Sequence, residues 1–211
     1  MTTGTGAQGA QQGRQKHLNQ VRQAQVKQER RRRRRIRVAS VGAAVAVIAA
    51  VVAMMLTSRQ ESTSATRVAP DFTLTDTSGT KVSLSALRGK NVLLYFSEGA
   101  GCQSCLVQMG QIEKDPDIAK VGLTVLPIVM NTREQITADM AANGVRTPFL
   151  LDDGTVSKAY GTLGKGMHAG LPGHSFVLID KTGNQRWYGE YPSMWLSTAD
   201  LLDQVRTHLT G

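Results

Sequence analysis

Along the chain, one long apolar run is followed by a region in which short apolar runs alternate with amphipathic segments. The long run, residues 38–56, contains no charged residue. As a helix, these 19 residues would extend about 28 Å, close to the thickness of a bilayer core. A domain of this size could hardly enclose such a helix, so the run predicts one transmembrane helix. It is also longer than the apolar region of about 7–15 residues in a signal peptide, which favours an uncleaved anchor.

Beyond residue 67, two periodicities alternate. Apolar runs predict strands buried on both faces at 91–97 and 122–129. Shorter runs predict strands at 72–74, 81–84, 148–151, 176–179 and 185–191. Helical spacing and end signals predict helices over 102–113, 133–143 and 197–209, and a helical turn at 155–160. Residues 161–173 contain five glycines and no periodicity, which predicts a long loop. This order predicts an α/β sandwich with a mixed central sheet flanked by helices.

The formal net charge of +9 belongs to the N-terminal segment. Residues 1–37 hold 11 of the 25 basic residues and one acidic residue, Glu29, which leaves 14 basic and 15 acidic residues elsewhere. A nucleic-acid-binding face would spread its basic residues over a folded surface, so we expect no nucleic-acid partner. Residues 1–37 begin with a stretch rich in Gln and Gly, and we expect a basic, largely disordered tail.

The position of the basic residues predicts the domain organisation and the topology. The arginine cluster directly precedes residues 38–56, so the positive-inside rule places residues 1–37 in the cytoplasm. Residues 57–67 are polar and rich in Ser and Thr, as expected of a linker. The folded domain, 68–211, would then lie outside the cytoplasm on a single-pass protein of the cell membrane. Disulfides persist in such a compartment.

Cys102 and Cys105 are the two cysteines of the chain, and they lie where the predicted strand 91–97 gives way to the predicted helix 102–113. At a helix N-terminus, unpaired N–H groups and the macrodipole favour a thiolate and lower the pKa of Cys102. Cys105, one turn later, is in reach to attack a mixed disulfide on Cys102. An inert structural disulfide is an alternative. Half of a zinc site is another, but it needs two more ligands at a suitable spacing.

The segments around the cysteines carry further motifs. They are Ala69-Pro70-Asp71-Phe72-Thr73-Leu74, Leu87-Arg88-Gly89-Lys90, and Ser175-Phe176-Val177-Leu178-Ile179-Asp180 followed by Gly183. In this order they resemble the thioredoxin-like superfamily, in its redoxin or AhpC/TSA-type branch. Residues 68–211 look similar to TlpA-like, membrane-anchored thiol–disulfide oxidoreductases of high-GC Gram-positive bacteria. The resemblance implies a thioredoxin-like sandwich, here preceded by one transmembrane helix.

Two positions depart from the patterns of that superfamily. The peroxiredoxin signature has a proline seven residues and a threonine three residues before its reactive cysteine, where this chain has Tyr95 and Gly99. The threonine hydroxyl that would orient a peroxide is therefore missing. The cis-proline that faces the cysteines in thioredoxins would fall on His174, and Pro172 lies two residues earlier. Either Pro172 takes that place or His174 faces the sulfurs.

These arguments assign roles to five residues. Cys102 is the attacking nucleophile and Cys105 the resolving thiol. Glu98, in the loop before Cys102, would accept the proton of Cys105 if it is partly buried. His174 would stabilise the Cys102 thiolate or act as an acid or base. Pro172 would position the substrate.

We therefore expect a monomeric thiol–disulfide oxidoreductase that acts on protein or small-molecule disulfides and thiols. No organic cofactor is implied, and an unidentified partner must donate the electrons. A peroxiredoxin-like peroxidase with an antioxidant role is one alternative. A metallochaperone similar to the Sco-type copper chaperones is the other, because Cys102, Cys105 and His174 would suit Cu(I). Those proteins have a C-x-x-x-C spacing, whereas this chain has C-x-x-C.

Overall fold

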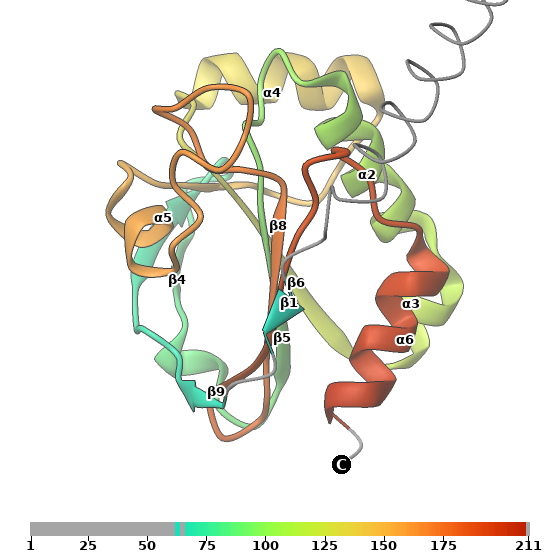
Figure 1. Cartoon of the computed structure of the whole chain (residues 1–211). Coiled ribbons are helices and arrows are strands. Elements are labelled where there is room, and N and C mark those ends of the chain that lie inside the picture. The colour runs from blue at the N-terminus through green and yellow to red at the C-terminus, as the bar shows by residue number, and fades with distance from the viewer. Residues whose placement is uncertain (1–61, 64–65, 210–211) are drawn as a thin grey trace, which may run out of the picture. The chain divides into compact units, whose positions relative to one another are not determined.

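A nine-stranded mixed sheet forms the centre of the part that the computed structural model describes, residues 62–63 and 66–209 (Figure 1). The strands are β1 (Ser62–Thr63), β2 (Arg67–Val68), β3 (Thr73–Asp76), β4 (Lys81–Ser83), β5 (Asn91–Phe96), β6 (Leu123–Val129), β7 (Leu150–Leu151), β8 (Ser175–Ile179) and β9 (Asn184–Glu190). Their order is β1-β9-β8-β5-β6-β7-β3-β4, and β2 also pairs with β9. The pairs β5–β6 and β6–β7 are parallel, while β8 is antiparallel to β5 and β9. The predicted mixed sheet is confirmed.

Helices cover both faces of this sheet. They are the α-helices α2 (Gln103–Lys114), α3 (Pro116–Lys120), α4 (Arg133–Asn143), α5 (Thr155–Ala159) and α6 (Thr198–Leu209), and the 3₁₀ turn η1 (Ser85–Leu87). In Figure 1, α2, α3 and α6 lie together on one side and α5 lies on the other. Leu93 and Tyr95 of β5 face the α2 side, and Leu94 and Phe96 face the α5 side. Because both faces are buried, β5 reads as a continuous apolar run.

Two features escaped the sequence analysis. The predicted linker 57–67 contains β1 and begins β2, and both pair with β9. Their pairing uses backbone groups, which a polar composition neither requires nor prevents. The short helix α3 was also missed, although Asp115 caps its N-terminus and Pro116 occupies its first position, a recognised start signal.

Within residues 62–63 and 66–209, no helix is long and apolar enough to cross a membrane. The predicted transmembrane helix 38–56 and the basic tail 1–37 lie outside the described residues. Both stay predictions.

The helix α4 matters for the site because it begins where β6 ends, beside the N-terminus of α2. Thr132 accepts a hydrogen bond from the backbone of Gln135, whose side chain accepts one from the backbone of Thr132. This capping box fixes the first turn, and Gly144 closes the helix in a left-handed conformation. The bounds predicted for this helix, 133–143, are confirmed.

Candidate active site

Cys102 and Cys105 form a disulfide at the N-terminus of α2. Cys102 is the N-cap residue, and its sulfur accepts a hydrogen bond from the backbone N–H of Cys105 at 3.3 Å. The two sulfurs differ in environment, because Cys102 is half-buried while Cys105 is fully buried. A partner can therefore approach Cys102 but not Cys105.

Side chains from the β6–α4 segment hold the backbone that leads to Cys102. Asn131 Oδ1 accepts a hydrogen bond from Ala100 N at 2.9 Å, and Asp139 Oδ2 accepts one from Gly101 N at 2.7 Å. Gln103, in the first turn of α2, donates to Asn143 Oδ1. Hydrogen bonds from the β6–α4 segment thus hold both residues that precede Cys102 in place.

Gly99 lies at the point where this loop leaves β5, and the site requires a glycine there. Its φ is +73°, and a Cβ atom would collide with Asn131 Oδ1 and lie 2.7 Å from Cγ1 of Val129. The threonine of the peroxiredoxin signature has no room at this position. The backbone conformation and the neighbouring side chains therefore exclude a threonine at position 99.

We expect Gly99→Ala to destabilise the fold more than Gly101→Ala, and urea unfolding followed by tryptophan fluorescence measures both. Gly101 also has a positive φ, +85°, but open space around it, so alanine there pays only about 1–2 kcal/mol of backbone strain. Alanine at Gly99 adds overpacking of about 1–3 kcal/mol. Equal free energies of unfolding for the two variants would contradict this account of the loop.

His174 is the residue that faces Cys105 from the other side of the site. It is buried just before β8, and its Nδ1 lies 3.9 Å from Cys105 Sγ. Burial lowers the pKa of His174 from 6.5 to about 4, so the imidazole is neutral at physiological pH. Of the two arrangements that the sequence left open, the structure shows His174 beside the Cys105 sulfur.

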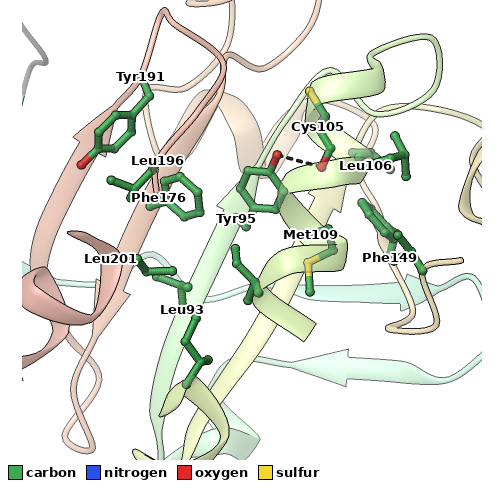
Figure 2. Close-up of a cluster of buried hydrophobic side chains, with 14 of the residues drawn as sticks. Leu93, Tyr95, Cys105, Leu106, Met109, Phe149, Phe176, Tyr191, Leu196 and Leu201 are labelled. Atoms are coloured by element: carbon green, nitrogen blue, oxygen red, sulfur yellow. Dashed lines mark hydrogen bonds between the residues drawn. The ribbon is translucent and has the colours of Figure 1, made fainter. Parts of the chain in front are cut away.

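Tyr95, on β5, lies between His174 and the first turn of α2, and Figure 2 shows its hydroxyl directed at the backbone oxygen of Cys105. Its hydroxyl donates to the backbone oxygen of Cys105 at 3.2 Å and lies 3.2 Å from His174 Nδ1. Burial raises the pKa of Tyr95 well above 10, so the phenol keeps its proton. We assign that single proton to the hydrogen bond with the Cys105 oxygen, and with this assignment the hydroxyl oxygen accepts from His174. We therefore assign the imidazole proton to Nδ1, the nitrogen nearest to Cys105 Sγ.

Glu98 is buried, as its predicted role requires, but its carboxylate is engaged elsewhere. One oxygen accepts from the backbone N–H of His168 at 3.0 Å, and the other lies 2.7 Å from His168 Nδ1. A Cβ atom at Gly166 would collide with the same carboxylate. Glu98 therefore fastens the loop 161–173 to the segment before Cys102, and its role as a base for Cys105 stays a prediction.

Pro172 ends that loop and is buried. It forms a β-bridge with Leu163, and the next residue, Gly173, donates its N–H to the Thr162 oxygen at 2.8 Å. None of the peptide bonds between described residues is cis. The structure thus gives Pro172 a place at the base of the loop, two residues before His174, and its substrate-positioning role stays a prediction.

The copper alternative stays a prediction. Among the described residues, no group of three or more His, Cys, Asp and Glu side chains is arranged to hold a metal ion. Cys102 and Cys105 are bonded to each other, and His174 Nδ1 is directed toward Tyr95.

The sequence analysis missed three residues that shape the site. Tyr95 appeared only as a departure from the peroxiredoxin signature, and Asn131 and Asp139 were not singled out. Asn131 lies two residues after a predicted buried strand, at the carboxyl end of the sheet where sites commonly form, and this signal could have found it. Asp139 lies on the surface side of a helix 38 residues from its partner Gly101, and nothing local in the sequence marks it.

Comparisons with known proteins agree with this fold. The chain is similar in structure to a 2-Cys peroxiredoxin of Plasmodium vivax, with a TM-score of 0.60 and 21% identity over 69% of this chain and 96% of that one. This likeness shows the predicted thioredoxin-like fold.

The proteins similar to this chain in sequence are named either as peroxiredoxins or as thiol–disulfide oxidoreductases. A candidate peroxiredoxin of Mycobacterium tuberculosis is 34% identical over 99 residues, which are 46% of this chain and 63% of the relative. The thiol–disulfide oxidoreductase ResA of Bacillus anthracis is 31% identical over 117 residues, 54% of this chain and 63% of the relative. The chain thus spans less than two thirds of the length of these relatives.

The profile of the AhpC/TSA family matches residues 65–187, more than half of the chain. The chain belongs to the AhpC/TSA family.

Proposed function

We propose that this protein is a membrane-anchored, extracytoplasmic thiol–disulfide oxidoreductase that works through Cys102 and Cys105. The observation that carries the proposal is the asymmetry of the pair. Cys102 is reachable and caps α2, whereas Cys105 is buried beside His174. An inert structural disulfide has no need of an accessible sulfur at a helix N-terminus or of a neutral imidazole beside the buried one.

The reaction follows from these positions. The Cys102 thiolate attacks one sulfur of a substrate disulfide, forming a mixed disulfide and releasing the first substrate thiolate, which takes up a proton. The Cys105 thiolate then attacks Cys102 Sγ, and the second substrate thiolate leaves. Two electrons pass from the cysteine pair to the substrate. Thiols of an electron-donating partner restore the pair by the same steps in reverse.

His174 supports the second step. Cys105 must become a thiolate in a buried site, where an unsolvated charge is costly. The Nδ1–H of His174, 3.9 Å away in the oxidised form, is the donor placed to stabilise that charge. Because the pKa of about 4 keeps the imidazole neutral, it acts as a hydrogen-bond donor rather than as a cation at pH 7.

The membrane anchor and the location rest on the chain before the described residues. Residues 38–56 are apolar over a bilayer's thickness, and the arginine cluster before them supports a cytoplasmic N-terminus. A redox-active disulfide suits an extracytoplasmic domain. We propose that residues 57–67 connect this anchor to the sheet, with β1 and β2 fixing the linker's end to β9.

Peroxide reduction is the second candidate, because relatives of the chain include proteins named as peroxiredoxins. Two positions weigh against it. Gly99 has no room for the threonine of the signature, and Tyr95 fills the place of its proline. Disulfide exchange needs neither residue.

Sealed vesicles carrying the full chain, oriented as in the cell, test the proposal in one preparation. After reduction, a membrane-impermeant maleimide should label the cysteines from outside. The vesicles should reduce insulin disulfides with dithiothreitol as donor, and should consume hydrogen peroxide no faster than a Cys102→Ser control. Labelling only after the vesicles are opened would refute the location. Cys102-dependent peroxide turnover without insulin reduction would establish the peroxidase instead.

A further inference from the structure

The two side chains that fasten the backbone before Cys102 differ in charge. Asn131 is neutral and holds Ala100, whereas Asp139 carries a carboxylate and holds Gly101, the residue immediately before the nucleophile. Both side chains are half-buried. An amide at position 139 could accept the same hydrogen bond, so the fold does not require a negative charge there.

This charge acts on the sulfur that reacts. When Cys102 becomes a thiolate, a second negative charge forms one residue away from the group that the carboxylate binds. Like charges this close in the chain oppose each other, so a carboxylate held 2.7 Å from Gly101 N disfavours the Cys102 thiolate. The carboxylate also occupies the Gly101 N–H, the amide directly before the N-cap residue Cys102, so this donor is not available to an anion at the site.

Other charged groups near the loop do not supply the same effect. Glu98 precedes Gly99, but both of its carboxylate oxygens lie within hydrogen-bonding distance of His168. Gln103 and Asn143, which bond each other beside Asp139, are neutral. His174 faces Cys105 rather than the entrance to α2.

We propose that Asp139 is a positioning residue that restrains Cys102, setting how much thiolate forms and how strongly the pair oxidises its partners. It fixes the Gly101 backbone and opposes the charge that the N-terminus of α2 favours. The inference rests on the proposed function and deepens it, because it identifies a group that tunes the same disulfide from a different element.

A reciprocal pair of substitutions tests this proposal. Asp139→Asn removes the charge and keeps an acceptor for Gly101, while Asn131→Asp adds a charge at the matched position on Ala100. In the full chain carrying Cys105→Ser, Cys102 is the one remaining cysteine, so its thiolate absorbance titrates a single group. We expect Asp139→Asn to raise the acid dissociation constant of the Cys102 thiol about threefold to tenfold and Asn131→Asp to lower it by a similar factor. Asp139→Glu, which keeps the charge, should stay near the parent protein.

The potential of the intact pair provides the second measurement. Above the pKa values of both thiols, the reduced form of Asp139→Asn should be favoured by the same factor against glutathione, making the pair more oxidising. A change below about 1.5-fold in both the acid dissociation constant and the equilibrium with glutathione would overturn the inference. Shifts in the same direction for Asp139→Asn and Asn131→Asp would also overturn it, because they would indicate disturbed packing rather than a charge effect. If the parent pair shows no reversible couple, the proposed function fails, whatever the two variants do.

Discussion

Replacing Cys105 with serine should trap Cys102 in a stable mixed disulfide with its substrate. Cys102 remains accessible at the N-terminus of α2, so the first attack proceeds, while the buried thiol that would resolve the intermediate is gone. Well-oriented intramolecular groups act at effective concentrations far above those of free thiols, so turnover should fall at least about a thousandfold. Non-reducing electrophoresis with mass spectrometry identifies the adduct and its sulfur.

Cys102→Ser is the matched control. It should abolish turnover without accumulating any adduct, because the remaining Cys105 is fully buried. If Cys102→Ser accumulated the adduct and Cys105→Ser did not, the two roles would be exchanged. A protein in which both variants kept their activity would not use this pair for catalysis.

Removing the imidazole of His174 should slow the second step and leave the first intact. His174→Phe keeps an aromatic ring among Tyr95 and Phe176, whose ring centroids lie 5.0 and 5.6 Å away, but deletes the donor to Cys105. A hydrogen bond to a charged group contributes about 1.5–3 kcal/mol, so resolution should slow about 10- to 150-fold. Rapid-quench measurement of the mixed disulfide separates the two steps. Tyr95→Phe, which leaves the imidazole in place, should have a smaller effect.

His174→Phe should also change how the free energy of unfolding depends on pH. The pKa of His174 is about 4 when folded and near its ordinary 6.5 when unfolded. As pH falls below 6.5 the unfolded chain binds a proton first, so stability declines until about pH 4 and then levels off. The loss for this group amounts to about 3 kcal/mol. Urea unfolding between pH 7 and 4 should show that component in the parent protein and not in His174→Phe. An identical pH dependence would mean that His174 is not buried in its neutral form.

Sequence periodicity located the elements whose side chains decide their structure. β5 is buried on both faces and reads as an apolar run, and α4 carries a capping box and a terminal glycine. β1 and β2 could not be found this way, because backbone pairing with β9 defines them. The predicted α/β sandwich depends on the first kind of element and was correct.

The candidate site was predictable where neighbours in the sequence are neighbours in space. The spacing of Cys102 and Cys105 identified the disulfide directly. Tyr95 and His174 are 79 residues apart and meet because β5 pairs with β8, so their contact appeared only in the fold. Burial of Glu98 was only a condition of its predicted role, and its partner His168 lies in a loop whose course the sequence pattern does not specify.

The reduction potential of the Cys102–Cys105 pair tests the central claim most directly. The full chain would be equilibrated in glutathione or dithiothreitol buffers, and the fraction of disulfide measured by thiol trapping. The account predicts a reversible couple between about −270 and −120 mV, the range spanned by thioredoxin and DsbA. A pair that remains oxidised below about −300 mV would be a structural disulfide and would contradict the account.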